Sequence, residues 1–254
     1  MILIKSEEEI AIMAEGGRRH AEILALVAAR AIPGVSTAEL DRYAEELVLA
    51  GGDQPAFKGY TPSGVSKPYP ATLCTSVNHV VVHGIPSPDH ILKDGDIISI
   101  DLGLRHRGLF TDAAITIPVG NADPKALELI SVTRESLEIG IAAARVGNTV
   151  GDIGHAIQSF IAKRYGIVKG LAGHGVGRRI HEDPFVPNYG KAGTGEKLIP
   201  GMTLAIEPML TLGKHAVDFL SDEYTVETRD GGLAAHAEHT IAITENGPVV
   251  LTKL

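Results

Sequence analysis

The apolar residues of the first fifty positions recur at helical spacing in two segments. In residues 7–31 they follow a period of three to four residues, and Pro33-Gly34 ends the run. The second segment opens with Ser36-Thr-Ala-Glu39, which has the spacing of a capping box, and its apolar residues continue to Val48. The sequence therefore predicts two consecutive helices at the start of the chain.

The pattern then changes twice. Residues 54–72 are rich in Gly, Pro, Ser and Lys, which predicts a surface loop. Short apolar and β-branched runs fill residues 73–119 and again residues 198–251, and such runs indicate strands. Between them helical spacing returns at 124–145, and Thr149-Val-Gly-Asp152 predicts the cap of a helix that extends to about residue 165.

The order of two helices followed by strands occurs twice, and short segments repeat with it. Asp94-Gly-Asp-Ile-Ile-Ser-Ile-Asp101 aligns with Pro200-Gly-Met-Thr-Leu-Ala-Ile-Glu207, and Asp112-Ala-Ala-Ile-Thr-Ile aligns with Glu238-His-Thr-Ile-Ala-Ile. We interpret the chain as one α+β domain, residues 1–254, built from duplicated halves of about 1–120 and 121–254. The alignment places Asp101 in register with Glu207, and Asp112 with Glu238.

Composition narrows the class of protein. A net charge of -8 argues against the nucleic-acid backbone as the main partner. The single cysteine, Cys74, excludes an intrachain disulfide framework and suggests a reducing compartment. The opening MILIKSEEEI resembles no signal peptide, and no apolar stretch approaches the roughly 18 residues of a membrane span. We expect a cytoplasmic globular protein that does not enter a membrane.

Asp101 and Asp112 border two of the apolar runs. The segment between them predicts a hairpin with His106-Arg107 at its tip, which would place the two acids directly opposite each other. Two carboxylates at ~4 Å repel by about 4 kcal/mol at an effective dielectric constant near 20. A shared proton, a basic partner or a metal ion would relieve this repulsion. The alternative is another register, in which each aspartate is a solvated turn residue.

Glu207 and Glu238 border apolar runs in the second half in the same way. Four acids in one pseudo-symmetric site are reasonable if two divalent ions lie between them, and added imidazole suits Mn, Fe, Co or Zn. Two such ions can share a water, lower its pKa and direct it at a carbonyl group.

The segment GLAGHGVGRRIHEDP offers two histidines. Either His174 or His181 could complete the metal shell, while the other donates a hydrogen bond to a substrate oxygen. Glycines 173, 175 and 177 would let the backbone approach the site closely. The alternative is a glycine-rich loop with histidines as polar filler. His83 is a third candidate, whereas His79 is expected to be exposed.

Together these motifs resemble type I methionine aminopeptidases, which have the pita-bread fold. The resemblance runs from about Ile4 to Leu251 and rests on VVVHGIP, LKDGDIISIDLG, FTDAA, GHGVGRRIHEDP, MTLAIEP and AEHTIAIT, in that order. It implies two pseudo-twofold halves that form a curved antiparallel sheet covered by helices. It also implies two divalent ions, Co, Mn, Fe or Zn, held by Asp101, Asp112, His174, Glu207 and Glu238.

The resemblance further implies removal of the initiator methionine from nascent polypeptides with a small second residue. A metal-bound hydroxide would attack the first peptide bond. Glu207 would shuttle the proton, His181 would stabilise the oxyanion, and His83 would contact the scissile amide nitrogen. The expected enzyme is a cytoplasmic monomer, with the ribosome as a candidate partner.

The methionine pocket implied by the resemblance is formed by Tyr69, Cys74, Ile180 and Tyr224, together with the two outer histidines, His83 and His181. It departs from the family pattern, because Tyr224 stands where many relatives have Trp and Phe57 stands where a small residue is common. The segment Gly59–Tyr69 is longer than in short forms of the family. This segment could form a wall of the substrate cleft or be a solvated insert. Cys74 could equally be a small buried core residue.

Two other readings compete. A prolidase or aminopeptidase P would share scaffold and metals but usually has a separate N-terminal domain. A non-catalytic pita-bread protein that binds peptides would be expected to lose metal ligands, whereas all five positions are filled here.

Overall fold

The computed structural model describes residues 2–162 and 164–254 of the chain. The described helices are α1 (Glu7–Arg30), α2 (Thr37–Ala50), α3 (Pro124–Ala143) and α4 (Val150–Ile161). Capping boxes at Ser6, Ser36 and Thr149 open α1, α2 and α4, so the last two caps are confirmed. Helix α4 ends earlier than residue 165, and position 163 of the predicted span lies outside the described residues.

The main sheet is nine-stranded, and the strand pairings described within it are antiparallel. Its path runs β1-β4-β5-β14-β9-β7-β8, with β2 beside β4 and β15 beside β14. These strands are β1 (Gln54–Pro55), β2 (Leu73–Val77), β4 (Ile97–His106), β5 (Leu109–Pro118), β7 (Gly173–Gly175), β8 (Glu182–Val186), β9 (Thr203–Ile206), β14 (Glu238–Thr244) and β15 (Gly247–Val250).

Two small sheets of three strands complete the fold. One contains β6 (Gly166–Ile167), β10 (Met209–Thr211) and β13 (Ala234–His236). The other contains β3 (Val80–Val82), β11 (Val217–Phe219) and β12 (Val226–Thr228).

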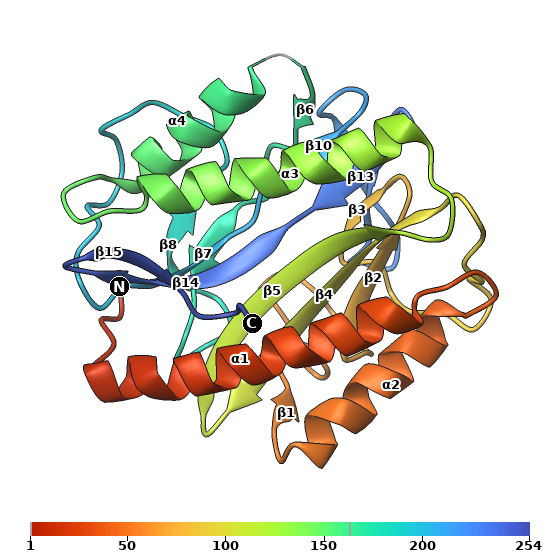
Figure 1. Ribbon diagram of the computed structural model, residues 1–254, viewed down its shortest axis with the longest axis horizontal. Helices are drawn as coiled ribbons and strands as arrows, with labels where there is room; N and C mark the ends of the chain where they lie inside the picture. Colours follow the sequence, from red (N-terminus) through yellow and green to blue (C-terminus); the bar gives the residue numbers. More distant parts are fainter. Residues whose placement is uncertain (1, 163) are drawn as a thin grey trace.

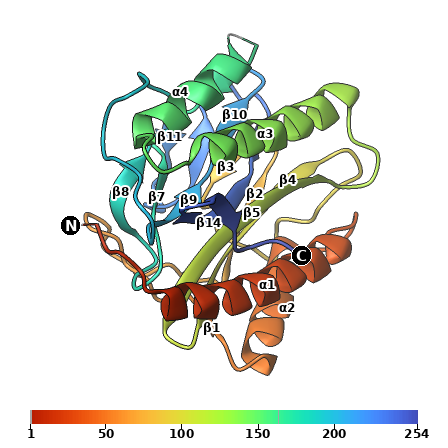
Figure 2. The same ribbon diagram turned by 60° about the vertical axis from the view of Figure 1, so that its left-hand side comes forward.

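Figure 1 shows the long sheet curving behind α1 and α3, with α2 beside α1 and α4 beside α3. The turned view in Figure 2 shows the same pairing of helices. The sheet thus carries its helices on one face, which confirms the α+β class and the curved, helix-covered sheet. The two-halves interpretation stays a prediction.

Apolar side chains alternate along the central strands, so that one face of the sheet packs in the core and the other face does not. Ile98, Ile100, Leu102 and Leu104 of β4 are buried in one cluster with apolar residues of α1 and α2. Because neighbouring side chains of a strand point to opposite faces, Asp101 points away from the helices. A second cluster joins Leu204 and Ile206 of β9, and Ile241 and Ile243 of β14, to α3 and α4.

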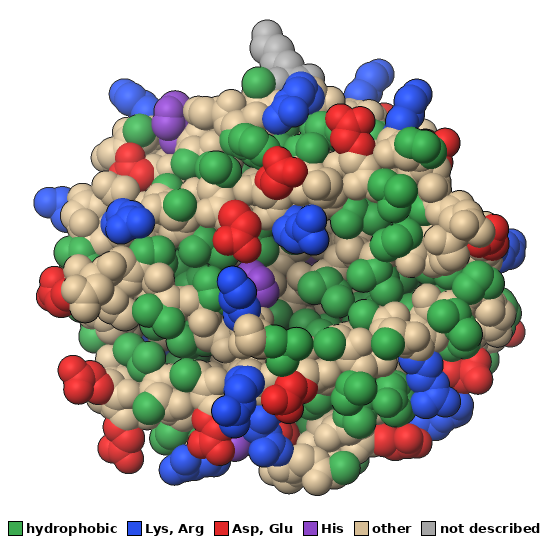
Figure 3. Space-filling view, viewed as in Figure 1, with side chains coloured by type: hydrophobic (Ala, Val, Ile, Leu, Met, Phe, Trp, Pro, Cys, Tyr) green, Lys and Arg blue, Asp and Glu red, His purple; other side chains and the backbone are tan. Residues whose placement is uncertain are grey.

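The helical side of the molecule is a mixed surface. Figure 3 shows acidic and basic side chains interspersed over this face, with apolar side chains between them. None of the described helices is long and apolar enough to cross a membrane.

Candidate metal centre and substrate pocket

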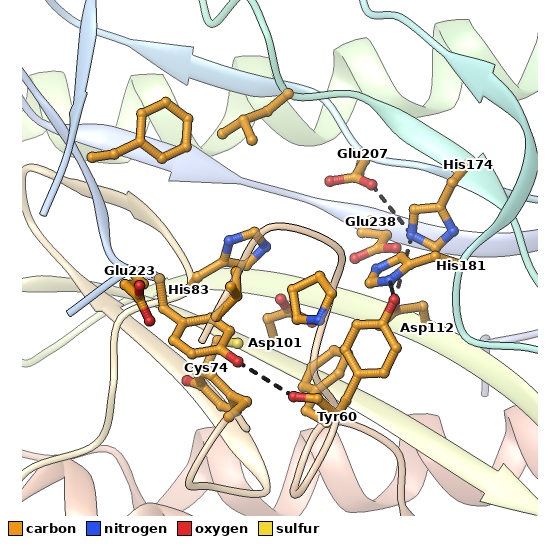
Figure 4. A pocket seen from close by; sticks show the side chains of 17 residues that line it. Tyr60, Cys74, His83, Asp101, Asp112, His174, His181, Glu207, Glu223 and Glu238 are labelled. Atoms are coloured by element: carbon orange, nitrogen blue, oxygen red, sulfur yellow. Dashed lines mark hydrogen bonds and ion pairs between the residues drawn. The ribbon is translucent and has the colours of Figure 1, made fainter. Parts of the chain in front are cut away.

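Five predicted ligands lie on five successive strands of the sheet path. Asp101 is in β4, Asp112 in β5, Glu238 begins β14, Glu207 directly follows β9, and His174 is the middle residue of β7. Figure 4 shows their side chains converging at one end of a pocket. The sheet therefore brings together acids and an imidazole that are spread from position 101 to position 238 of the sequence.

His174 faces the acids through one defined nitrogen. Its Nδ1 hydrogen-bonds the carbonyl oxygen of Gly175 at 2.9 Å, which leaves Nε2 free to act as a ligand. Nε2 lies 3.7 Å from Oδ2 of Asp112 and 3.6 Å from Oε1 of Glu207. These separations exceed a hydrogen bond and suit donors arranged around a shared cation.

The unsatisfied atoms of this cluster fit a cation. Oδ1 of Asp101, Oδ1 of Asp112 and Oε1 of Glu238 are buried and have no hydrogen-bond partner among the described residues. Burial raises the pKa of Asp101 to about 7. Burial, followed by the charge of a neighbouring acid, raises the pKa of Asp112, Glu207 and Glu238 well above the ordinary range. Bound divalent cations would remove this cost of burying like charges.

The hairpin between Asp101 and Asp112 has a different register from the predicted one. Its tip is Arg107-Gly108, where both residues have positive φ, 48° and 90°, as in a type I′ turn. Asp101 therefore pairs with Ala114, and Asp112 pairs with Gly103. The two acids are diagonal rather than directly opposite, yet they share one face and remain in the cluster.

The glycines beside His174 allow close contacts between backbone segments. A Cβ on Gly173 would lie 2.2 Å from the carbonyl oxygen of Ala205, and one on Gly175 would lie 2.1 Å from that of Asp183. These glycines let neighbouring backbone pack tightly around β7, and a close approach of this backbone to the metal cluster stays a prediction. Gly177 has φ +146, a conformation that strains other residues.

His83 and His181 lie on the pocket beside the acids, as Figure 4 shows. The rings of His174 and His181 are 4.5 Å apart between centroids. Burial, followed by the neighbouring His181, lowers the pKa of His83 to about 4, so His83 is neutral at pH 7. Nδ1 of His181 is 2.9 Å from the hydroxyl of Tyr60, a residue that the sequence reasoning missed.

The pocket has a cavity volume of about 180 Å³, and aromatic and apolar side chains form much of its wall. Tyr69, Cys74 and Tyr224 line it, as predicted. The Tyr69 hydroxyl donates to the carbonyl oxygens of Leu73 and Gly84, and its ring meets that of Tyr224 edge-on at 5.0 Å. A dry cavity of ~150 Å³ holds benzene, so this one has room for a single medium-sized apolar side chain.

The long segment Gly59–Tyr69 is a wall of this pocket. Tyr60, Pro62, Val65 and Tyr69 line it, so the prediction of a surface loop over 54–72 was incomplete. Ile180, by contrast, is not among the described lining residues and packs in an apolar cluster with Phe57, Tyr69 and Cys74. His79 is exposed, as expected.

The sequence reasoning also missed several residues near the site. Leu171, Phe219 and Glu223 line the pocket, but they belong to loops and a short strand without a motif of their own. His236 lies next to the acid cluster, with its Nε2 3.6 Å from Oε2 of Glu207. Its position two residues before Glu238 was a usable signal, because residues i and i+2 of an extended segment share a face.

Comparison with known proteins gives consistent results. The model of metallopeptidase family M24 matches residues 11–245. The methionine aminopeptidase of Clostridium acetobutylicum is 46% identical over 253 residues, covering 99% of both chains. The crystal structure of methionine aminopeptidase from Thermotoga maritima superposes with a TM-score of 0.95 at 43% identity and covers 100% of each chain.

More distant structures share the fold. The prolidase from Pyrococcus horikoshii has a TM-score of 0.76 at 25% identity, and the match covers 100% of this chain but 64% of the prolidase.

Proposed function

Because this chain belongs to metallopeptidase family M24, we propose that it is a metal-dependent methionine aminopeptidase of the bacterial type I class. It removes methionine from the N-terminus of polypeptides whose second residue is small. The observation that carries the proposal is a small apolar pocket that ends at a cluster of buried carboxylates and imidazoles. An exopeptidase needs this combination of one side-chain pocket and one hydrolytic centre.

In this proposal Asp101, Asp112, His174, Glu207 and Glu238 hold two divalent ions. Buried unsatisfied oxygens on three of these side chains support the assignment. Carboxylate with imidazole suits Mn, Fe, Co or Zn. When bound, such ions polarise a carbonyl group and lower the pKa of a water.

The side chains of the pocket then have separate tasks. The methionine side chain occupies the space between Tyr69, Cys74 and Tyr224. Glu207 takes a proton from the attacking water and passes it to the leaving nitrogen. His181 donates a hydrogen bond to the carbonyl oxygen as charge develops on it.

His83 contacts the scissile amide nitrogen from the other side of the pocket. Its low pKa keeps it neutral at pH 7, so one ring nitrogen can donate and the other can accept a proton. The free α-amino group of the substrate binds beside Asp101, which restricts cleavage to the first peptide bond.

We propose that the substrates are nascent chains in the cytoplasm, that the ribosome is a candidate partner, and that the enzyme acts as a monomer, with residues 1–254 as one catalytic domain. Gly59–Tyr69 covers one side of the pocket, and this favours substrates that insert a free N-terminus into it.

The test is hydrolysis of matched peptides by protein loaded anaerobically with Co or Mn. We expect cleavage of Met-Ala-Ser and much slower cleavage of Leu-Ala-Ser and of Xaa-Pro-Xaa peptides. Preferential cleavage of Xaa-Pro-Xaa would instead assign a prolidase or aminopeptidase P. Peptide binding without hydrolysis by the metal-loaded protein would assign a binding protein.

A further inference from the structure

His236 is a buried histidine at the edge of the acid cluster. We propose that it is a second imidazole ligand of the metal centre, so that each of the two ions has a nitrogen ligand. The inference rests on the proposed metal centre but not on its peptidase activity. His236 is 2% exposed and ends β13, and Ala237 alone separates it from Glu238.

The distances around His236 match those around His174. Its Nε2 lies 3.6 Å from Oε2 of Glu207 and 3.8 Å from Oε2 of Glu238. His174 Nε2 has separations of 3.7 Å and 3.6 Å from its two acids. Two ligands bound at about 2.1 Å to one ion lie roughly 3.0–3.6 Å apart, so both imidazoles stand within a few tenths of an ångström of ligand spacing.

Three groups of side chains could hold an ion. One joins Asp112, His174 and His181, and the other two share Glu238. Asp101, His236 and Glu238 place one ligand atom each within 4.8 Å of one another, and so do His174, Glu207 and Glu238. Glu238 belongs to both sets and could bridge them. Each of these two sets contains one imidazole and two carboxylates. Asp101 and Glu238 lie on either side of β5, and Glu207 follows β9, the strand next to that of Glu238.

Other buried or partly buried histidines show what a structural role looks like in this chain. Nδ1 of His20 bonds the hydroxyl of Thr111 at 3.0 Å, Nδ1 of His106 bonds Asp53 at 2.7 Å, and Nδ1 of His239 bonds the hydroxyl of Thr252 at 2.9 Å. Neither ring nitrogen of His236 has a hydrogen-bond partner among the described residues. A bound cation would satisfy this buried imidazole, which has no partner, together with the neighbouring acids that also lack partners.

The backbone of His236 is fixed by Thr116 of β5. The amide N–H of His236 donates to Oγ1 of Thr116 at 2.9 Å, and the Thr116 hydroxyl donates to the carbonyl oxygen of His236 at 2.7 Å. Oγ of Ser99 lies 2.7 Å from the same Thr116 oxygen. This clamp holds the histidine against the main sheet beside Glu238, where ligand geometry has to be reproducible.

An imidazole in each set has a chemical consequence. With carboxylates alone, a site favours Mg, Ca or Mn, whereas added imidazole favours Fe, Co and Zn. We infer that His236 raises the affinity of the Asp101–Glu238 position for these ions. Loss of His236 should weaken that position and leave the His174 position unchanged.

The experiment is titration of the metal-free full chain with Co(II), followed by calorimetry and visible absorption. The variant is His236→Gln, and the control is His239→Gln, since His239 lies beside Glu238 but bonds Thr252. We expect two ions in wild type and in the control, and at least about tenfold weaker binding of one ion in His236→Gln. Wild-type affinity and an unchanged cobalt spectrum in a folded His236→Gln protein would overturn the proposal.

A measurement on wild type covers the case in which the variant does not fold. Proton NMR of the Co(II)-loaded protein should show two strongly shifted, solvent-exchangeable imidazole N–H signals, one from each bound histidine. A single such signal at full loading would overturn the proposal, as would failure of wild type to bind cobalt. Two bound ions with two imidazole signals but no cleavage of Met-Ala-Ser would support this inference while rejecting the proposed function.

Discussion

Asp101 and Glu238 lie in one row across the sheet with only the methyl group of Ala114 between them. The Cα of Ala114 pairs with that of Asp101 on one side and with that of Glu238 on the other. Side chains that are directly opposite in neighbouring strands share a face, and two strand spacings are about 9–10 Å. Because the middle residue, Ala114, has a small side chain, there is space between the two acids for them to coordinate cations.

The first prediction follows from this row. Ala114→Leu should fill the space between Asp101 and Glu238 and abolish tight cobalt binding, which calorimetry would measure. Overpacking should also cost about 1–3 kcal/mol of unfolding free energy. Ala114→Ser, which adds one small atom, is the control and should bind cobalt. Unimpaired binding by folded Ala114→Leu would show that the ions do not lie over this residue.

The row could not be read from sequence because the hairpin register was misjudged. A tip at His106-Arg107 makes Asp101 oppose Asp112, whereas Gly108 supplies a positive φ that moves the tip by one residue. Moving the tip by one residue shifts the cross-strand pairing by two residues. Because side chains alternate between faces with a period of two, both acids still lie on the predicted face of the sheet. The acids were therefore predicted in the same cluster but in the wrong relation to one another.

Motifs with their own chemistry were identified from sequence, and residues that act only through tertiary contacts were not. The helix caps and the acids that border apolar runs have local patterns. Tyr60 and Glu223 have none, since each acquires its contact from a segment more than a hundred residues away. His236 is intermediate, because its spacing from Glu238 was visible but its unpaired ring was not.

The second prediction concerns Glu207. Glu207→Gln should lower kcat for Met-Ala-Ser by at least about 10²-fold, because the amide cannot accept the proton. Metal content measured on the same samples separates loss of proton transfer from loss of an ion. Glu245→Gln, at an exposed hairpin turn, is the matched control and should retain full activity. Near-normal turnover by metal-replete Glu207→Gln would remove the assigned shuttle.

The third prediction concerns the contact between Tyr60 and His181. The Tyr60 hydroxyl is 2.9 Å from Nδ1 of His181, and the rings lie 5.1 Å apart. His181→Ala should lower kcat by about 10²–10³-fold with metal retained, as for loss of an oxyanion donor. Tyr60→Phe should lower kcat less, and the double variant should resemble His181→Ala alone, because both act through one ring. Additive losses would mean that Tyr60 acts independently.

The fourth prediction concerns the wall formed by Gly59–Tyr69. Glu223 accepts hydrogen bonds from the amide and hydroxyl of Ser66, and the Tyr224 hydroxyl donates to the carbonyl oxygen of Lys67 at 2.6 Å. Loss of one such hydrogen bond changes an equilibrium constant, such as that for substrate binding, by a few-fold to about tenfold. Glu223→Ala should therefore raise KM for Met-Ala-Ser by that factor and leave kcat within about twofold. A fall in kcat at constant KM would place Glu223 in the chemistry instead.

The fifth prediction is a pH dependence of stability. Both oxygens of Glu9, in the first turn of α1, accept hydrogen bonds from Arg178, at 2.7 Å and 2.9 Å. This contact lowers the pKa of Glu9 to about 2 from 4.5. A lowered folded-state pKa stabilises the fold above the unfolded value, and that contribution is lost as pH falls from about 4.5 towards 2.

Glu9→Gln isolates this charge, because the amide can still accept from the N–H of Ser6 in the capping box. Since the pair is partly exposed, we expect the variant to lose only about 0.5 kcal/mol of unfolding free energy at pH 7. Urea unfolding from pH 7 to pH 2.5 should show the difference from wild type shrinking steadily below pH 4.5. A difference that stayed constant with pH would mean that Glu9 contributes through packing or capping and not through its charge.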